Sequence, residues 1–447
     1  MRKTLQRILF GFFIFLFLLL LWVGINSFDQ EDFDDLGMLS QIQYPSDKNN
    51  GYAVLLTHME EQGSMLLSSD TDKLREQVSF ENYDPDFIDQ VVESNANLYL
   101  KIEEAVAKSD FAFPEVKTAM DIPAYPPFID ANRYLLLKIA YHYIRDEKED
   151  LLNALELSIL LSTKVMSESG HTLISYFIGM HMLEGTLSYI KYYLREEDYF
   201  SLSDLDRLRI ILEAVVAAEK LAFPMSFTGE YRFLFNRLTT PLKMGIQERM
   251  DEFHGIYGDF NTDYSRKILF YLYAIYPYYF IHPNAALDEL AHEIKELQKQ
   301  SKLWCKDVPN RYAHPERDSF LLRLLPGSVV DVEKYKDTFA SLFSRRCHSL
   351  VNIEAVNTMI GLRNYTQKHR TLPSSLKALV PEYLKALPVD YFDGQALRYN
   401  RKAKTLYSLG MNIIDGGGSA DGVYIGRCKE SAPCFNNPTF LIDWGDS

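Results

Sequence analysis

The spacing of hydrophobic positions divides the chain into three parts with different expected structures. Residues 8 to 25 form an uncharged, apolar run that follows Arg2, Lys3 and Arg7. At 1.5 Å per residue this run makes about 27 Å of helix, close to the hydrocarbon thickness of a bilayer. Basic residues precede the run and acidic residues crowd behind it. The pattern predicts one transmembrane helix with its N-terminus in the cytoplasm and the remaining chain on the other side.

A cleaved signal peptide is the competing interpretation of this run. The apolar region of a signal peptide is shorter, and no small-x-small cleavage site follows the stretch from Trp22 to Asn26. We therefore expect an uncleaved anchor in residues 1–28 and an acidic linker in residues 29–50.

Between residues 51 and 345 the apolar positions recur with a helical period. Residues 134–143, 150–166 and 171–194 carry aliphatic and aromatic side chains at three- and four-residue steps. These segments predict an all-helical domain built from antiparallel hairpins. Their architecture resembles the paired helices of tetratricopeptide proteins, although no repeat of about 34 residues runs along the region.

Two further helices in this region have recognisable ends. Ser203 with Asp206 is a helix start signal. Pro224 is expected to end the same helix, because proline lacks the backbone N–H that a helix interior requires. A later amphipathic helix is expected to begin near Pro283.

Residues 346–447 change character and predict a small α+β domain. A helix is expected over residues 353–368. Two short alternating segments, 396–400 and 405–409, flank a charged turn and predict a β-hairpin. A glycine-rich loop and a third short strand, over residues 440–444, follow. The whole chain is therefore expected to be mostly α-helical.

The charge of the chain narrows the classes of partner. Hydrophobic residues make up 47% of the chain, a share typical of folded protein. Its 447 residues include 47 Lys and Arg against 61 Asp and Glu, a formal net charge of −14. Such a surface repels phosphate backbones, so we expect no nucleic-acid partner.

The cysteines, all in the last third of the chain, fit an oxidising compartment. Cys428 and Cys434 are close in sequence and favour one local disulfide, which would leave Cys305 to pair with Cys347. Four cysteines permit three pairings, so the other connectivities stay open. A zinc site would require C-x-x-C or histidine spacing, which these residues lack.

An ordered set of short motifs runs from Asn352 to Trp444. The set comprises a helix ending at Tyr365 and His369, then Leu372-Pro373, Leu376 to Val380, Tyr383-Leu384, Leu387-Pro388-Val389-Asp390, Gly394, Leu397-Arg398-Tyr399, Tyr407-Ser408-Leu409-Gly410, and Asp415 with the glycines behind it. In this order it resembles the globular domain of the major, G-type pseudopilin of type II secretion systems. The resemblance implies the same α+β fold for residues 346–447.

Other features depart from that family. A pseudopilin begins with a short basic leader and a Gly-Phe-Thr-Leu-x-Glu segment, whereas Gly11-Phe12-Phe13-Ile14-Phe15 lacks the Thr and the Glu. The family's Asp-Pro-Trp-Gly appears as Asp390-Tyr391-Phe392-Asp393-Gly394, and a long helical region separates the apolar run from the pseudopilin-like part. We interpret this part as a borrowed domain and not as a pilus subunit. The whole layout resembles bacterial envelope proteins with an anchor, a helical middle and this kind of tail.

The glycine-rich loop is a candidate calcium site. In the pseudopilin the loop corresponding to Asp415 through Asp421 binds calcium, so the resemblance implies a similar site. Asp415, Ser419, Asp421 and Asp443 offer oxygen ligands, and the glycines let the backbone curl around an ion. The spacing is not that of an EF-hand, and an ordinary glycine turn with solvated acids explains the same residues. A structural Ca²⁺ is therefore one of two interpretations.

The sequence lacks the common catalytic motifs. Gly-x-Ser-x-Gly, a phosphate loop and Gly-x-Gly-x-x-Gly are missing, and His292-Glu293 is not completed to His-Glu-x-x-His. Three carboxylate–histidine pairs have the spacing that shares a helix face: Glu168/His171, Asp251/His254 and Glu289/His292. The further inward carboxylates that a di-iron bundle needs cannot be assigned, so we expect surface or core-edge roles for these pairs.

Taken together, these features favour a non-enzymatic scaffold of the bacterial inner membrane. Its bulk would lie in the periplasm and bind a protein partner of the envelope, in a role linked to envelope assembly or secretion. The alternative is a periplasmic hydrolase whose residues converge only in space, drawn from His171, His181, Glu184 and His254. An accessory secretion component that engages pseudopilins through its tail is a third hypothesis. A deep pocket would favour the hydrolase, and an open apolar face the scaffold.

Overall fold

The computed structural model describes a mostly helical protein. The residues described are 14, 17–25, 28, 32–41, 46–62, 84–113, 125–167, 172–196, 198–249, 282–308, 332–418 and 438–442. The helices are α2 (Gly51–Gln62), α4 (Pro85–Ser94), α5 (Ala96–Val106), α6 (Pro126–Ile144), α7 (Lys148–Ser167), α8 (Leu173–Tyr193), α9 (Leu202–Lys243), α13 (Pro283–Gln300) and α14 (Val332–His369). The strands among these residues are β1 (Arg398–Asn400), β2 (Thr405–Tyr407) and β3 (Thr439–Leu441). The predicted fold class, mostly α, is confirmed.

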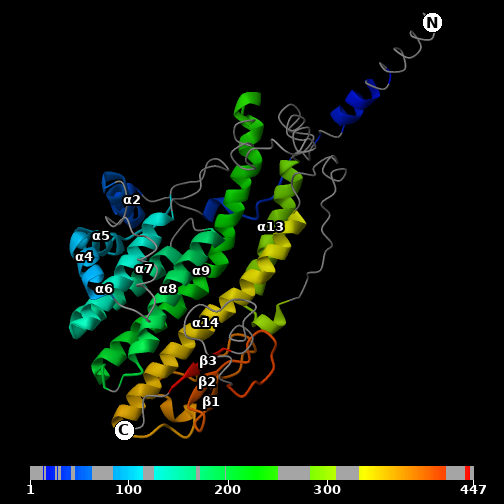
Figure 1. The fold of residues 1–447 in the computed structure, drawn as a ribbon. Helices are drawn as coiled ribbons and strands as arrows, with labels where there is room; N and C mark the ends of the chain where they lie inside the picture. The colour runs from blue at the N-terminus through cyan, green and yellow to red at the C-terminus, as the bar shows by residue number, and fades with distance from the viewer. Residues whose placement is uncertain are drawn as a thin grey trace, which may run out of the picture.

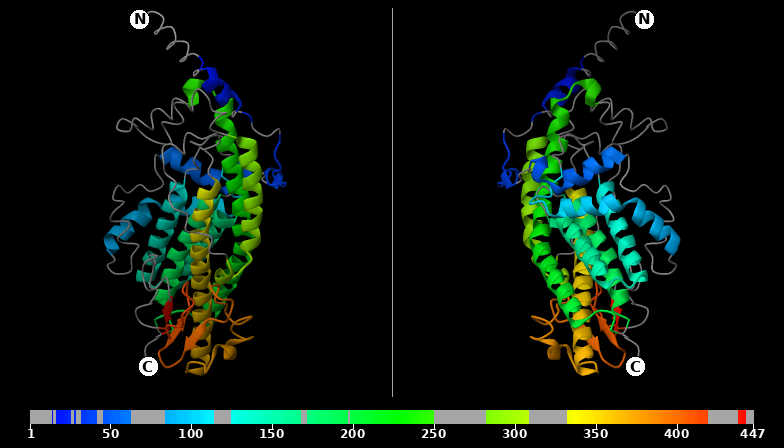
Figure 2. Two further views of the ribbon diagram at one scale, coloured as in Figure 1. Left: turned by 90° about the vertical axis from the view of Figure 1, so that its right-hand side faces the viewer. Right: turned by 90° about the vertical axis from the view of Figure 1, so that its left-hand side faces the viewer.

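The longer helices run along one long axis, with the strands at one end (Figure 1). α6, α7 and α8 follow one another as antiparallel neighbours, and α9 and α14 run beside them along the length of the molecule (Figures 1 and 2). The helical residues 17–25 lie at the opposite end from the sheet, near the end of α9 (Figure 2).

Local signals in the sequence account for several helix starts. α4 begins with Asp84, whose side chain accepts a hydrogen bond from the backbone N–H of Phe87 at 3.2 Å, followed by proline at the first helical position. α9 begins with a reciprocal cap, in which Asp204 accepts from the N–H of Ser201 and donates its own N–H to the Ser201 hydroxyl. The start signal was therefore predicted two residues too late, at Ser203 and Asp206.

The expected end of this helix at Pro224 is wrong, because α9 continues through the proline to Lys243. A proline inside a helix costs about 3 kcal/mol or more through its missing N–H and its clash with the preceding turn. Phe223 and Phe227 on either side of it are fully buried and contact the Phe343 ring of α14. Burying a large apolar side chain contributes roughly 1.5–3 kcal/mol, so packing of these two rings offsets the cost.

A continuous apolar core joins the helices. Its largest fully buried side chains include Tyr134 of α6, Tyr176 and Tyr189 of α8, and Phe223 of α9. The Tyr hydroxyls keep polar partners: Tyr134 donates to the carbonyl of Val92, and Tyr176 to a carboxylate of α9. These two tyrosines thus bury their rings in the core while their hydroxyl groups stay hydrogen-bonded.

The three strands form one antiparallel sheet in the order β1-β2-β3, with Leu406 opposite both Tyr399 and Phe440. The predicted hairpin and its charged turn are confirmed. The third strand is confirmed in type, although it covers Thr439–Leu441 and the predicted residues 443 and 444 lie outside the described part. The sheet lies beside the second half of α14 (Figure 1).

The helix predicted over 353–368 is the second half of α14, which begins at Val332 and ends at His369. The expected domain boundary between residues 345 and 346 thus falls inside a single helix. The first described side chains of α14 include Phe343, which is buried against α9. One helix therefore serves both the helical domain and the sheet.

Within the described part of the chain, no helix is both long enough and apolar enough to span a bilayer. The described part of the predicted span over 8–25 consists of residue 14 and residues 17–25. Apolar side chains of this segment are exposed, with Phe17 at 65% and Leu18 at 54%. The transmembrane helix stays a prediction.

Candidate functional site

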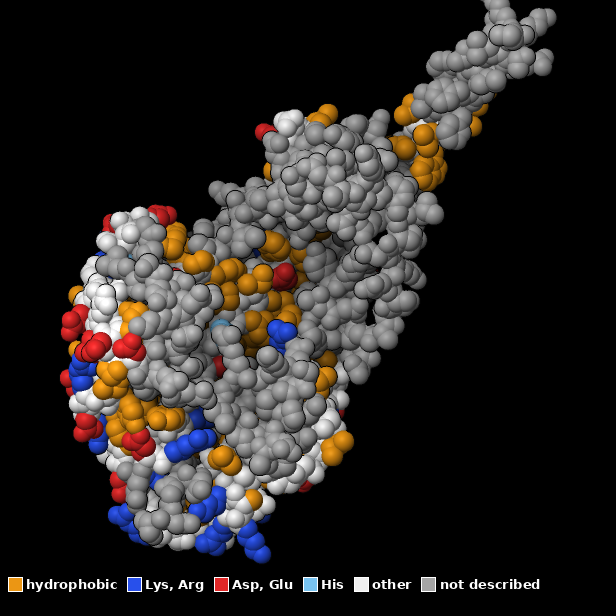
Figure 3. Space-filling model, viewed as in Figure 1, with side chains coloured by type: hydrophobic (Ala, Val, Ile, Leu, Met, Phe, Trp, Pro, Cys, Tyr) orange, Lys and Arg blue, Asp and Glu red, His pale blue; other side chains and the backbone are white. Residues whose placement is uncertain are grey.

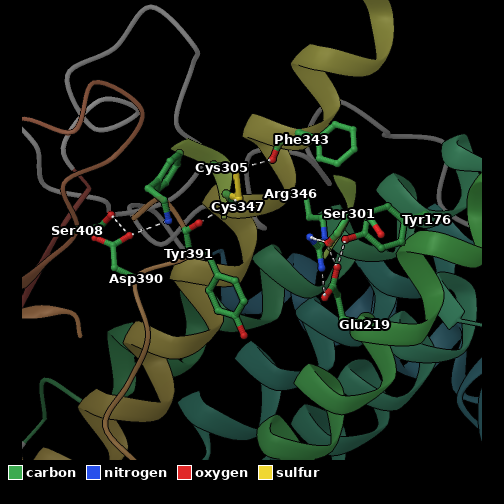
Figure 4. The surroundings of a disulfide bond; sticks show 11 residues. Tyr176, Glu219, Ser301, Cys305, Phe343, Arg346, Cys347, Asp390, Tyr391 and Ser408 are labelled. Atoms are coloured by element: carbon green, nitrogen blue, oxygen red, sulfur yellow. Dashed lines mark hydrogen bonds and ion pairs between the residues drawn. A yellow bond between two sulfur atoms is a disulfide. The ribbon is translucent and has the colours of Figure 1, made fainter. Parts of the chain in front are cut away.

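The end of α13, the middle of α14 and the loop before β1 come together around a disulfide bond. A disulfide between Cys305 and Cys347 joins the segment that follows α13 to helix α14 (Figure 4). Beside it, the N–H of Cys305 donates to the carbonyl of Tyr391 at 3.1 Å, and the N–H of Lys306 to that of Phe392 at 2.9 Å. The backbone hydrogen bonds thus hold the C-terminal loop against the segment after α13, and the disulfide fixes that segment to α14.

This pairing is the one that the sequence favoured for Cys305 and Cys347. Cys428 and Cys434 lie outside the described residues, so their disulfide stays a prediction. Trp304, next to the bridge, adds a ring contact with Tyr391 at 5.9 Å between centroids. Its ring also lies against the backbone of Gly394, where a Cβ atom would come within 2.6 Å of it.

Asp390 organises the C-terminal loop from a fully buried position. Its carboxylate accepts hydrogen bonds from the N–H of Phe392 at 3.1 Å, the N–H of Leu409 at 3.0 Å and the hydroxyl of Ser408 at 2.8 Å. Arg398 of β1 pairs with it at 2.6 Å. Burial raises the pKa of Asp390, and the surrounding donors oppose that shift. The carboxylate is fully engaged in joining the loop to β1 and to the end of β2.

A second buried carboxylate joins three helices on the other side of the disulfide (Figure 4). Glu219 of α9 accepts from Arg346 of α14 and, at 2.7 Å, from the hydroxyl of Tyr176 of α8. Arg346 also donates to the carbonyl of Ser301 at 2.8 Å, and its guanidinium lies 4.5 Å from the centroid of the Phe223 ring. Buried charges persist when they are paired and hydrogen-bonded, as this pair is.

A polar seam lies between α8 and α14. Lys191 of α8 is 5% exposed and donates to the Asn352 side chain at 3.2 Å. Further along, the hydroxyl of Ser349 donates to Glu184 at 2.6 Å. Burial lowers the pKa of Lys191 to about 7, an effect that the nearby Glu184 opposes. This lysine changes its charge near neutral pH.

Glu354 of α14 is a second group whose pKa is shifted by burial. Burial raises its pKa to about 7; Lys220 of α9 opposes the shift and Glu213 adds to it. Glu213 itself pairs with Arg209 at 2.8 Å and with Lys385 at 2.6 Å. The α9–α14 interface therefore contains an acid whose charge also depends on pH near neutrality.

The candidate calcium residues are only partly described. Ser419, Asp421 and Asp443 lie outside the described residues. Asp415 accepts a hydrogen bond from the N–H of Gly417 at 2.9 Å, which is a local turn, and it interacts with the Tyr407 hydroxyl. Its carboxylate thus has protein partners in this structure, and calcium binding stays a prediction.

The histidines proposed for a hydrolase are not gathered within the described part of the chain. His171 and His254 lie outside it, and so do Glu168 and Asp251. His181 of α8 is exposed, whereas Glu184, one turn further, takes part in the polar seam. Glu289 and His292 are both exposed on α13.

One cluster was missed in the sequence. His142 at the end of α6 lies 2.7 Å from Glu147, and with Asp150 their ligand atoms all lie within 4.8 Å of one another. Burial lowers the pKa of His142, which the bond to Glu147 opposes. Glu147 directly precedes α7 and Asp150 lies in its first turn, where negative charge stabilises a helix N-terminus, so the cluster has a structural explanation.

The surface of the molecule is unevenly charged. On the face shown in Figure 3, Lys and Arg side chains gather at the lower end, where the sheet lies in Figure 1. Arg401 and Lys402 in the β1–β2 turn are exposed. Against the net charge of −14, this end of the molecule forms a locally basic surface.

Comparisons with known proteins found no matching family model, no similar curated protein and no similar solved structure.

Proposed function

We propose that the chain is a single-pass, membrane-anchored periplasmic scaffold that acts through protein contacts and not through catalysis. The observation that carries this proposal is the helix over residues 17–25, whose apolar side chains, Trp22 among them at 47%, are exposed (Figure 3). Uncovered apolar residues at this density are unfavourable in water, and a bilayer would cover them. The basic residues before the run set the expected orientation.

The buried polar groups support a scaffold and not a hydrolase. Glu219, Arg346 and Asp390 are each bonded to neighbouring protein groups. Such groups stabilise the junctions between helices and sheet, where a catalytic site would direct them towards a substrate. The disulfide at Cys305 and Cys347 agrees with a periplasmic location, where oxidised cysteines persist.

The form of the C-terminal part supports a pseudopilin-like domain. It consists of a long helix, α14, followed by a short antiparallel sheet at its second half. The hairpins of α6, α7 and α8 agree with a tetratricopeptide-like architecture for the helical domain. In this proposal the helical array presents a face to an envelope partner, as stacked helix hairpins commonly do.

Membrane anchoring is tested with the full chain expressed in a bacterial host. After osmotic shock and an alkaline carbonate wash, the protein should remain in the inner-membrane pellet. In spheroplasts, added protease should degrade the bulk of the chain. Release by carbonate, or protection from protease in intact spheroplasts, would contradict the anchor or its orientation.

The scaffold role needs a partner. Affinity purification of the full chain from detergent-solubilised membranes should recover the same envelope protein in independent preparations. A variant with Arg401→Glu and Lys402→Glu tests whether the basic end takes part, because both residues are exposed and the fold should be unaffected. Preparations that share no recovered protein would count heavily against the scaffold.

A further inference from the structure

An apolar stripe runs along the outer face of α9. We call the exposed residues Ile210, Ala214, Ala217, Leu221 and Met225 the α9 stripe. Ile210 is 60% exposed, Leu221 72% and Met225 49%. Single exposed apolar residues are normal on a protein surface, but a contiguous row along one helix face marks a contact surface.

The spacing of the α9 stripe is that of a coiled-coil seam. From Ile210 the steps to Ala214, Ala217 and Leu221 alternate between four and three residues, which is the a/d pattern of a heptad. With Met225 the row extends over about 22 Å of helix. The opposite face of α9, which includes Leu208 and Leu212, is buried in the core. The helix is therefore already held by its inner face, and its outer face has the geometry to receive another helix.

We propose that a second copy of this chain docks on the α9 stripe, with the two α9 helices parallel. The small Ala214 and Ala217 in the centre allow the helix backbones to approach closely, while Ile210 and Leu221 on either side supply the apolar contact. Identical residues then stack across a two-fold axis, so each side chain meets one of its own size.

The parallel direction follows from the geometry of the molecule. α9 runs along the long axis, and the helix over residues 17–25 lies at the end where α9 finishes (Figures 1 and 2). Two copies anchored in one membrane therefore bring their α9 helices together pointing the same way. In this respect the inference rests on the proposed membrane anchor.

The charges that border the α9 stripe are compatible with this pairing. On one border Glu213 is held within its own protomer by Arg209 and Lys385, and one heptad further Lys220 is exposed. On the other border lie Ile211 and Ala218, which carry no charge. In a parallel pair, the charged border of each helix faces the uncharged border of its partner, so no like charges oppose each other.

The size of the α9 stripe predicts how strongly the copies associate. Stable protein interfaces bury about 1,200–2,000 Å² in total, more than a single row of side chains on one helix provides. Confinement to a membrane raises the effective concentration of the two copies, and a weak contact is then sufficient. The pair is expected to form in the membrane and to dissociate on dilution in detergent.

Photo-crosslinking of the full chain in membranes tests the proposal. A benzophenone amino acid is placed at position 221, with a control at Leu100 of α5, which is 61% exposed. Two differently tagged copies are expressed together. Irradiation should give a product of twice the 51.8 kDa chain that carries both tags, from position 221 and not from position 100. Ala217→Glu should reduce this product more than about tenfold, because a charge would be buried in the contact.

Three results would overturn the pairing. They are equal yields from both positions, a product that carries one tag and another mass, and no product from position 221. Ala217 is exposed in the single chain, so loss of folding is not expected in the variant, and circular dichroism checks this. A carbonate wash of the same membranes reports the anchor separately. If the chain is released, the proposed function fails, and the crosslink alone then decides whether the copies pair.

Discussion

Arg346 of α14 and Glu219 of α9 form a two-pronged ion pair, with Nε 2.6 Å from Oε1 and Nη2 3.1 Å from Oε2. The side chain of Glu219 is fully buried and that of Arg346 is 7% exposed. Arg346 is also the residue next to Cys347 of the disulfide. The ion pair thus connects α9 with α14. One residue further along α14, the disulfide connects that helix to the segment after α13.

Removal of one member of this pair should destabilise the protein strongly. Arg346→Met leaves the Glu219 carboxylate buried without its guanidinium partner, while the hydrogen bond from the Tyr176 hydroxyl remains. We expect the free energy of unfolding to fall by about 3–5 kcal/mol. The double variant Arg346→Met/Glu219→Leu should lose less than the sum of the two single variants, since it buries no unpaired charge. Urea unfolding followed by circular dichroism measures both. Additive losses would mean that the pair is not coupled.

Loss of the disulfide should lower stability by a different route. Cys305 and Cys347 are separated by 42 residues, and cross-linking a loop of this length restricts the unfolded chain. The double variant Cys305→Ser/Cys347→Ser should lose about 3–4 kcal/mol. The wild-type protein in reductant should approach the variant, and reductant should have little further effect on the variant. A variant as stable as wild type would show that the bridge contributes nothing.

Two neighbouring glycines allow a matched test of the loop after β2. Gly417 and Gly418 have φ of +68° and +72°, so alanine at either position pays a backbone cost of about 1–2 kcal/mol. A Cβ at Gly418 would also lie 2.7 Å from the Thr405 hydroxyl and 2.8 Å from the Tyr407 ring, whereas at Gly417 it meets nothing within 4 Å. Gly418→Ala should therefore lower the melting temperature more than Gly417→Ala. Equal effects would contradict the packing of the loop on β2.

Stability should vary with pH in opposite directions on the two sides of neutrality. The pKa of Glu354 is raised from 4.5 to about 7 on folding, so its contribution to the free energy of unfolding falls as pH rises between these values. The pKa of Lys191 is lowered from 10.5 to about 7, so the unfolded chain binds more protons above pH 7 and the contribution of Lys191 rises with pH.

Variants separate the two effects. Relative to wild type, Glu354→Gln should remove the decline between pH 4.5 and 7. Lys191→Met should remove the rise that begins near pH 7. Thermal unfolding at intervals up to pH 9 gives the difference curves. If the stability difference between wild type and a variant does not change with pH in the range given for that residue, the pKa of the residue is not shifted in the folded protein.

Much of the helical part could be predicted from periodicity. α6, α7, α8 and α13 were placed from apolar residues at helical steps, because burial of one face is what stabilises a helix in a folded protein. Pro224 shows where local rules fail. The rings of Phe223 and Phe227 meet Phe343, which is far away in the sequence, and that contact is invisible to a rule about neighbouring residues.

The buried polar contacts could not be predicted for the same reason. Glu219 and Arg346 are 127 residues apart, and Lys191 and Asn352 are 161 apart. Neither pair has a spacing that marks it as a pair. The disulfide between Cys305 and Cys347 was easier to predict, because a cysteine has few possible partners and the number of pairings is small. The hairpin of β1 and β2 was predicted because both strands and their turn are adjacent in sequence.

The bridge between Cys305 and Cys347 also decides how tension would travel through the molecule. A pull on the sheet, from a partner bound to the tail, reaches α14 and passes through the sulfur atoms to the end of α13. The chain between residues 306 and 346 is bypassed and carries none of that pull. In a single-molecule stretching experiment, this segment should lengthen the chain only after the bridge is reduced.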